Sequence, residues 1–177
     1  ANSRKISFVT CSSLYSVKRL DLMIKLFSDI HNKFPNTELN IYGEGVKNRV
    51  GIKNQSYFLN NLVSELNLKN AVKFKGQVSN VHECLIQNDI YLMTSEREGF
   101  PNALSEALSV GLSSISFKCH DGLSELIQNG ENGYLINEGD HKGYVDTAIT
   151  LISNFSLRKK MGEKARESIK KYNYNRI

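Results

Sequence analysis

One stretch of this 177-residue chain decides the fold that we predict: Ile90-Tyr91-Leu92-Met93-Thr94-Ser95-Glu96-Arg97-Glu98-Gly99-Phe100-Pro101-Asn102-Ala103-Leu104-Ser105-Glu106-Ala107. Its first four residues are apolar and indicate a short buried strand. A polar loop containing Gly99 follows, and Pro101 is well suited to the first turn of a helix, where its missing N–H costs nothing. The stretch therefore predicts a strand, a loop and a helix start in direct succession.

Outward from this stretch, strand and helix patterns alternate along the chain. The apolar runs that indicate strands are Ile6 to Cys11, Leu39 to Tyr42, Ala71 to Phe74, Ile90 to Met93, Ser114 to Phe117 and Tyr134 to Ile136. Segments with the apolar spacing of helices separate most of these runs, and two more close the chain. Such alternation is typical of right-handed β-α-β crossovers. We therefore predict an α/β fold, a Rossmann-like parallel sheet of about six strands with helices on both faces.

Composition is that of one globular domain. The chain is 40% hydrophobic and 23% charged, and it contains two prolines. No apolar run approaches the roughly 18 to 20 residues that span a bilayer, and nothing resembles a signal peptide. Residues 1–5 lack an initiator methionine and run almost directly into a strand. We therefore treat residues 1–177 as a single domain and expect a piece of a longer cytoplasmic protein, with an N-terminal partner domain absent.

Cysteine spacing and charge exclude other classes. Cys11, Cys84 and Cys119 lie far apart without metal-ligand spacing, which favours buried free thiols in a reducing compartment. The formal charge is +5, and much of the excess lies near the C-terminus, at Arg158, Lys159, Lys160, Lys164, Arg166, Lys170 and Lys171. No aromatic residues interleave these cations, as a single-strand nucleic-acid binder requires. We interpret them as a solvated helix face and expect no nucleic-acid partner.

Ligands of open parallel sheets bind beyond the carboxyl ends of the strands. The loops that leave those ends are Ser12 to Lys18, Gly43 to Gly45, Gly76, and Thr94 to Asn102. At the last of them, the free amides of a helix start at Asn102 to Leu104 would suit an anion such as a diphosphate. Glu98 precedes this helix, and Glu106 lies one turn beyond Asn102. We therefore expect two carboxylates to border one phosphate site.

Glu98 and Glu106, with seven residues between them and Ala107 after them, resemble the signature of family 4 glycosyltransferases of the GT-B fold. Five more segments resemble the same family in order, namely Lys18-Arg19-Leu20-Asp21, Ile41-Tyr42-Gly43-Glu44-Gly45, Val72-Lys73-Phe74-Lys75-Gly76, Gly122 to Leu135, and Tyr172-Asn173-Tyr174. The resemblance implies the C-terminal half of a GT-B fold, which binds a nucleotide sugar. It also implies that the segment from Tyr172 to Arg176 packs toward the absent N-terminal domain.

The resemblance also implies a role for individual residues. Glu106 would bind the ribose hydroxyls, Glu98 would contact hydroxyls of the donor sugar, and Lys18 would neutralise the leaving diphosphate. The implied diphosphate cradle consists of Phe100, Pro101, Asn102 and Leu104, and Gly99 is implied as a further residue that binds the nucleotide sugar. Gly76 and Gln77 are candidates for the rim of the nucleobase site, with a purely structural turn as the alternative. No catalytic metal and no cofactor are implied, since the nucleotide sugar is itself the donor substrate.

One position departs from the family pattern. Ser13 stands where the family usually carries an arginine shortly before the phosphate-binding lysine. A serine donates a hydrogen bond but supplies no charge, so either Ser13 with its backbone amide suffices or donor binding is weaker than usual. Arg19 points elsewhere on a helix, and Arg97 is a substitute candidate beside the alternative of a solvated charge. His120 is a further candidate for contact with the substrate.

The function implied by the resemblance is transfer of a hexose from a nucleoside-diphosphate sugar to a glycan or lipid-linked acceptor, with retention of configuration. The acceptor would bind the missing N-terminal domain, so the isolated chain should be almost inactive, and peripheral membrane association of the full-length enzyme stays open. Alternatives are a noncatalytic nucleotide-sugar-binding domain and a GT-B nucleotide-sugar epimerase. A two-carboxylate glycoside hydrolase leaves the other segments unexplained, and a dinucleotide-binding module lacks Gly-x-Gly-x-x-Gly after the first strand.

Overall fold

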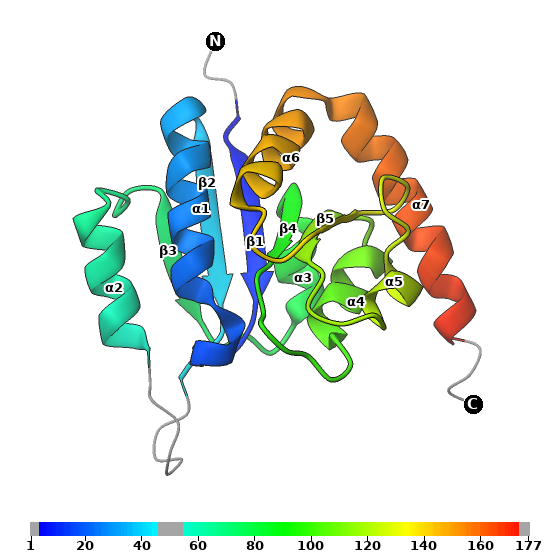
Figure 1. Cartoon of the computed structure of the whole chain (residues 1–177), viewed down its shortest axis with the longest axis horizontal. Helices are drawn as coiled ribbons and strands as arrows, with labels where there is room; N and C mark the ends of the chain where they lie inside the picture. The colour runs from blue at the N-terminus through cyan, green and yellow to red at the C-terminus, as the bar shows by residue number, and fades with distance from the viewer. Residues whose placement is uncertain (1–3, 46–54, 174–177) are drawn as a thin grey trace.

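The computed structural model describes residues 4–45 and 55–173, which form one parallel sheet with helices on both faces (Figure 1). The strands are β1 (Ile6–Cys11), β2 (Thr37–Tyr42), β3 (Val72–Gly76), β4 (Ile90–Met93), β5 (Ser113–Phe117) and β6 (Tyr134–Ile136). Their order in the sheet is β3-β2-β1-β4-β5-β6, and every neighbouring pair is parallel. The predicted Rossmann-like α/β fold with about six parallel strands is confirmed.

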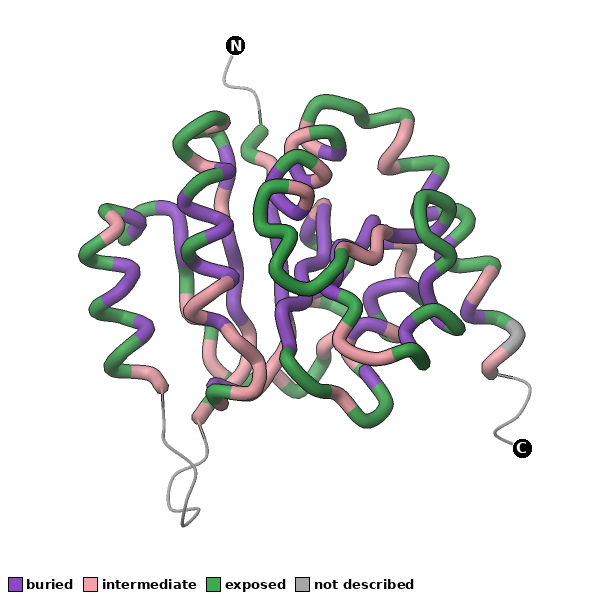
Figure 2. The backbone as a smooth tube through the Cα atoms, in the orientation of Figure 1, coloured by how far each residue is buried: buried purple, intermediate pink, exposed green. Residues whose placement is uncertain are grey.

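The helices are η1 (Ser16–Lys18), α1 (Leu20–Lys33), α2 (Ser56–Glu65), α3 (Val81–Ile86), α4 (Asn102–Ser109), α5 (Leu123–Leu126), α6 (His141–Ser153) and α7 (Phe155–Asn173). Apolar residues of α1, α2 and α6 form one core cluster against the sheet, and those of α3, α4 and α5 form a second cluster, to which α7 also contributes. Alternation along β1 supplies both clusters, because Phe8 faces the first and Val9 the second. The purple trace of the strands in Figure 2 reflects this double cover.

Strand β3 extends two residues beyond its predicted end at Phe74. It is an edge strand, and its side chains alternate between covered and exposed positions, with Lys73 and Lys75 exposed. Exposed lysines interrupt the apolar run, so the sequence pattern underestimates the strand. Such charges are common on edge strands, where they oppose pairing with another sheet.

The order of the strands places a crevice between β1 and β4. From β1 the chain proceeds outward to β2 and β3, and it then returns to β4 on the other side of β1. When the connections after two adjacent strands run in opposite directions, they leave a crevice at the carboxyl ends of those strands. Ligands of open parallel sheets bind in this crevice. The loops that follow β1 and β4 therefore border the candidate functional site.

The prediction of a solvated helix face was wrong for Arg158, which is half-buried, whereas Arg166 is exposed as predicted. The guanidinium of Arg158 donates to the carbonyls of Leu151 and Ile152 in the last turn of α6, the latter at 2.9 Å. Arg166 donates to the carbonyl of Val110, just beyond α4, at 3.3 Å. Helix C-termini carry unsatisfied carbonyls and partial negative charge, which attract cations. The lysines, in contrast, are exposed wherever their side chains are described, at Lys159, Lys160, Lys164 and Lys170.

Tyr172 lies at the start of the segment that was expected to pack toward an N-terminal domain, an expectation that stays a prediction. Its hydroxyl donates to the carbonyl of Glu125 in α5 at 2.6 Å, and its ring packs against the second core cluster. The residue therefore contacts its own domain, while residues 174–176 of the predicted partner-facing segment lie outside the described residues.

Across residues 4–45 and 55–173, no helix has the length and apolar character to cross a membrane. The three cysteines are free and partly buried.

Candidate functional site

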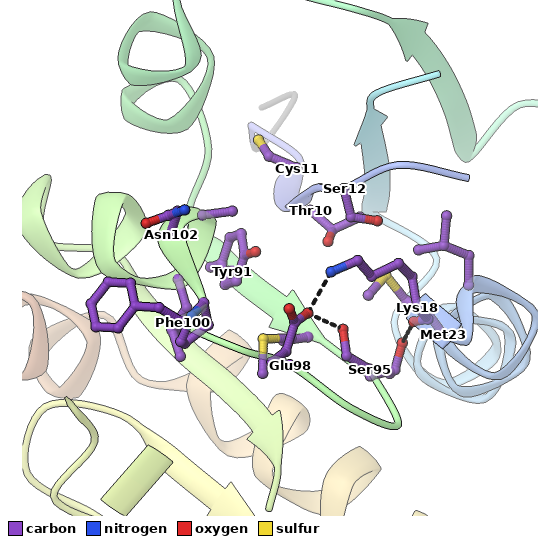
Figure 3. Close-up of a pocket in the computed structure, with 16 residues that line it drawn as sticks. Thr10, Cys11, Ser12, Lys18, Met23, Tyr91, Ser95, Glu98, Phe100 and Asn102 are labelled. Atoms are coloured by element: carbon purple, nitrogen blue, oxygen red, sulfur yellow. Dashed lines mark hydrogen bonds and ion pairs between the residues drawn. The ribbon is translucent and has the colours of Figure 1, made fainter. Parts of the chain in front are cut away.

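A cavity of about 170 Å³ opens at the carboxyl ends of β1 and β4 (Figure 3). One wall is the end of β1, with Thr10, Cys11 and Ser12, and Tyr91 and Met93 of β4 lie opposite. The remaining lining residues come from the turn before α1, the first turn of α1, the β4 loop and the start of α4, namely Lys18, Leu20, Met23, Thr94, Ser95, Glu98, Phe100, Pro101, Asn102, Ala103 and Leu104. The cavity therefore occupies the predicted crevice.

A pair of opposite charges crosses this cavity. The Nζ atom of Lys18 lies 2.7 Å from Oε1 of Glu98, and the Ser95 hydroxyl donates to the same oxygen at 2.5 Å (Figure 3). The side chains of Lys18 and Glu98 are only 21% and 12% exposed. Partial burial weakens screening by water, so the pair is stronger than an ordinary surface ion pair. The β4 loop and the turn before α1 thus meet at a charged contact.

The positions of both charges follow from backbone contacts between the two loops. The amide of Lys18 donates to the carbonyl of Tyr15 at 3.0 Å, which closes the short helix η1 before α1. The amide of Glu96 donates to the carbonyl of Val17 at 2.9 Å, and this bond joins the β4 loop to that turn. The two loops therefore place Lys18 and Glu98 on the same cavity.

Helix α4 begins at the cavity. Pro101 is the residue before the first helical position, one place earlier than predicted, and Asn102 begins the helix. The amide of Asn102 donates to the Phe100 carbonyl at 2.9 Å, and the amide of Ser105 donates to the Pro101 carbonyl at 3.0 Å. Among the described residues, the amides of Ala103 and Leu104 have no such acceptor. Free amides and the positive end of the helix dipole make this edge of the cavity suitable for an anion.

Other predicted site residues lie around the cavity rather than on its wall. Ser13 is partly buried beside its neighbour Ser12, which does line the cavity. Glu106 is exposed on α4 and does not line the cavity, whereas Glu98 does. Gly99 is also exposed and absent from the wall, while Phe100 lines it with 54% of its surface exposed.

The predicted nucleobase rim lies on the loop after β3. Gly76 accepts a hydrogen bond at its carbonyl from the amide of Gly43, at 2.8 Å, so the loops after β2 and β3 are joined. Gln77 is exposed, and neither Gly76 nor Gln77 lines the cavity. His120 is partly buried on the loop after β5, and its Nε2 atom is covered without a partner among the described residues. It does not line the cavity either.

Sequence analysis missed Thr10 and Tyr91 of the wall, and it named Ser12 and Ser95 only as members of the loops Ser12 to Lys18 and Thr94 to Asn102. Ser95 lies two positions beyond the end of β4, in a loop that is selected by the rule that ligands bind beyond the strand ends, although the rule does not distinguish it from its neighbours. Tyr91 carried no such signal. It lies inside a strand, and its burial raises the pKa of its hydroxyl, so this group stays neutral.

Thiols near the cavity stay protonated. Burial, followed by the nearby Cys84 and Glu106, raises the pKa of the Cys11 thiol to about 12. Burial also raises the pKa of Cys119, with the Glu98 carboxylate as the next contribution. A protonated thiol is a poor nucleophile and a poor metal ligand. The described residues contain no cluster of three or more His, Cys, Asp or Glu side chains that could hold a metal ion.

Positive charge in the cavity comes from a single side chain. Of the described lining residues, Lys18 alone is cationic. Arg97 is exposed and is not part of the cavity wall. In this structure it therefore does not replace the arginine that the family usually carries at the position of Ser13. Arg19 pairs with Asp21 at 3.7 Å and lines a separate cavity. The local charge balance is therefore one lysine against one glutamate.

The sheet order and the cavity at its switch point define a Rossmann-like α/β domain of the GT-B type, and comparison with known proteins identifies its family. Residues 1–168 match the family described as glycosyl transferases group 1, and the chain belongs to this family. The N-acetyl-alpha-D-glucosaminyl L-malate synthase of Bacillus anthracis is 33% identical over 169 residues, which are 96% of this chain and 42% of that protein.

Two further similarities agree with this result. The poly(ribitol-phosphate) alpha-N-acetylglucosaminyltransferase of Staphylococcus aureus is 29% identical over 159 residues, 89% of this chain and 30% of that protein. The crystal structure of S. aureus TarM in complex with fondaparinux, alpha-GlcNAc-glycerol and UDP superposes with a TM-score of 0.87 and 26% identity, over 96% of this chain and 33% of that one. The chain thus spans less than half the length of these relatives.

Proposed function

We propose that this chain is the donor-binding half of a retaining family 4 glycosyltransferase, which transfers a hexose from a nucleoside-diphosphate sugar to a glycan or lipid-linked acceptor. One observation carries the proposal. In a member of a glycosyltransferase family, the ammonium of Lys18 and the free amides of Ala103 and Leu104 face one cavity. A cation and a helix N-terminus together are suited to two adjacent phosphates.

In the proposed reaction the diphosphate lies over the start of α4, and the Lys18 ammonium exchanges its Glu98 partner for a phosphate oxygen. The bond between the anomeric carbon and the diphosphate oxygen breaks while the acceptor oxygen bonds to that carbon. The acceptor proton passes to the departing phosphate. Lys18 and the α4 amides stabilise the charge that develops on the leaving group. Glu98, released from Lys18, then accepts hydrogen bonds from hydroxyls of the sugar.

The proposed donor is a uridine-diphosphate sugar, with N-acetylglucosamine as the favoured hexose. The names of the two relatives described above both specify an alpha-N-acetylglucosaminyl group, and the TarM structure contains UDP. An alpha product from the usual alpha-linked donor corresponds to retention. Glu106 would hold the ribose from the exposed face of α4, Ser13 would donate to a phosphate, and Gly76 and Gln77 would border the base.

The acceptor would bind an N-terminal half outside this chain, in the cytoplasm or at the cytoplasmic face of a membrane. No metal or cofactor takes part in the proposed reaction, because Lys18 and the helix amides supply the positive charge. The 177-residue chain alone would bind the donor and transfer almost nothing.

The proposal is tested by titrating the chain with UDP, GDP, ADP and NAD in ligand-observed NMR. We expect selective binding of UDP, weakened at least about tenfold in Lys18→Ala, which corresponds to about 1.4 kcal/mol. Glu106→Ala should weaken the binding of UDP without affecting the binding of a diphosphate that lacks ribose, such as inorganic pyrophosphate. Lys33→Ala, an exposed lysine at the far end of α1, is the matched control. Tighter binding of NAD, or UDP binding unaffected by both site variants, would overturn the assignment.

One observation favours a second candidate, a domain that binds nucleotide sugar without transfer. Lys18 is the single cation of the described cavity wall, and Ser13 replaces the second one expected from the family. Sugar transfer by the full-length protein separates the candidates, while the Ser13→Arg variant tests the phosphate position, since an added guanidinium should strengthen UDP binding about tenfold if a phosphate lies beside it. UDP binding that the variant leaves unchanged, in a full-length protein that transfers no sugar, would favour the noncatalytic domain.

A further inference from the structure

The turn that carries Lys18 has an unfavourable backbone. Arg19 adopts φ 51 and ψ 41, the left-handed conformation, between η1 and α1. Only glycine and, less often, asparagine or aspartate adopt this region routinely, and for other residues it is strained. Such a conformation persists only when its surroundings hold it in place.

Thr94 supplies that restraint from the end of β4. Its side chain is buried, and its Oγ1 atom lies 3.0 Å from the carbonyl oxygen of Lys18 and 3.0 Å from that of Arg19. A hydroxyl has one proton, so it donates to one of these carbonyls at a time. Together with the bond from Glu96 to Val17, residues of one loop bind three successive carbonyls of the turn.

The same loop also holds the Lys18 side chain, through Glu98. In the proposed reaction this contact is released when the ammonium turns to the diphosphate. The contact of Thr94 is to the backbone, so it persists through that exchange. The hydroxyl therefore restrains the base of the Lys18 side chain in both states.

We propose that Thr94 is a positioning residue, whose hydroxyl holds the left-handed turn at Arg19 and so directs the Lys18 ammonium toward the diphosphate. The inference rests on the proposed function, since it assumes that Lys18 binds phosphate. Thr94 itself need not touch the nucleotide. Its removal should weaken recognition of the phosphates and leave recognition of the nucleoside unchanged.

The test compares Thr94→Val, which keeps the shape but removes the hydroxyl, with Thr94→Ser, which restores it. UDP and uridine are titrated against each variant by NMR, and thermal unfolding is recorded alongside. We expect Thr94→Val to weaken UDP binding about tenfold and uridine binding less than about twofold, because the Lys18 carbonyl loses its donor, whereas the Arg19 carbonyl keeps the Met23 amide. Thr94→Ser should return UDP binding to within about twofold of the original chain.

A double-variant cycle with Lys18→Ala shows whether Thr94 acts through the lysine. In the Lys18→Ala background, Thr94→Val should change UDP binding less than about twofold. If Thr94→Val lowers the melting temperature but keeps the ratio of UDP to uridine affinity, the residue is merely structural and the inference is overturned. If Lys18→Ala itself leaves UDP binding unchanged, the proposed function fails first.

Should Thr94→Val not fold, Thr94→Cys replaces it, since a thiol is a weak donor. UDP binding in Thr94→Cys should then be weaker than in Thr94→Ser by about threefold, with uridine binding equal in the two variants. Equal UDP binding in these variants would overturn the inference.

Discussion

The Nζ atom of Lys18 lies 2.7 Å from Oε1 of Glu98, although 80 residues separate the two along the chain. One lysine and one carboxylate therefore share a small cavity whose proposed ligand is itself an anion. Glu98 competes with that ligand for the ammonium, and its charge repels the phosphates. A neutral side chain at residue 98 should consequently strengthen binding of the nucleoside diphosphate and weaken transfer of the sugar.

Glu98→Gln is predicted to strengthen UDP binding about fivefold, since an ion-pair competitor worth about 1 kcal/mol is removed. Calorimetric titration of the chain measures the change. Glu96→Gln is the matched control, because Glu96 belongs to the same loop but is exposed and absent from the cavity wall. Weaker binding in Glu98→Gln would mean that Glu98 places Lys18 for the nucleotide rather than competing with it.

Gly43→Ala is predicted to destabilise the chain by more than about 3 kcal/mol, combining backbone strain with a steric clash. Gly43 has φ 132, and an added Cβ would lie 2.0 Å from the carbonyl oxygen of Ser12. Gly130→Ala is the control, since Gly130 has φ 81 but nothing within 4 Å of the added atom. It should cost only about 1 kcal/mol. Urea unfolding measures both, and equal losses would contradict the close approach of these loops.

Arg158→Ala is predicted to lower the free energy of unfolding by about 1 to 3 kcal/mol, because carbonyls at the end of α6 lose a charged donor. The neighbouring Lys159 is exposed, and Lys159→Ala should stay within about 0.5 kcal/mol of the original chain. Denaturant titration distinguishes the two. An equally small effect in both variants would restore the interpretation of Arg158 as a solvated charge.

Cys11 is predicted to react slowly with iodoacetamide, since burial raises the pKa of its thiol to about 12. In a chain carrying Cys84→Ser and Cys119→Ser, alkylation at pH 8 should be at least about a hundredfold slower than for free cysteine, because only the thiolate reacts. The rate should rise with pH throughout the range in which the chain stays folded, without levelling off near pH 9. Urea should abolish the difference, whereas rapid alkylation of the folded chain would contradict the burial.

Most of the fold was predictable because its signals are local. Strands such as Ile90 to Met93 appear as short apolar runs, and their helices as apolar spacing, since each buries one or two faces against the same sheet. The errors have local causes too. The end of β3 was misplaced because Lys73 and Lys75 are exposed on an edge strand, and Pro101 was placed one position too far into its helix.

The candidate site was predictable only as a set of loops. Glu98 and Lys18 were singled out, and the structure brings them together, whereas Ser95 was named only as part of a loop, and Thr10 and Tyr91 were missed. The spacing of Glu98 and Glu106 suggested two carboxylates on one site, yet only Glu98 lines the described cavity. The sequence places Glu106 on a helix, but it does not show the path of the preceding loop, which decides whether Glu98 and Glu106 face the same cavity.

The sequence by itself determined the α/β class, the succession of elements and the family pattern, because periodicity and turn residues act between near neighbours. Only the tertiary structure decided the strand order, the ion pair of Lys18 and Glu98, and the contact of Thr94 with the left-handed turn at Arg19. These contacts join residues more than 70 positions apart. Their geometry depends on how the whole sheet assembles, which no local pattern records.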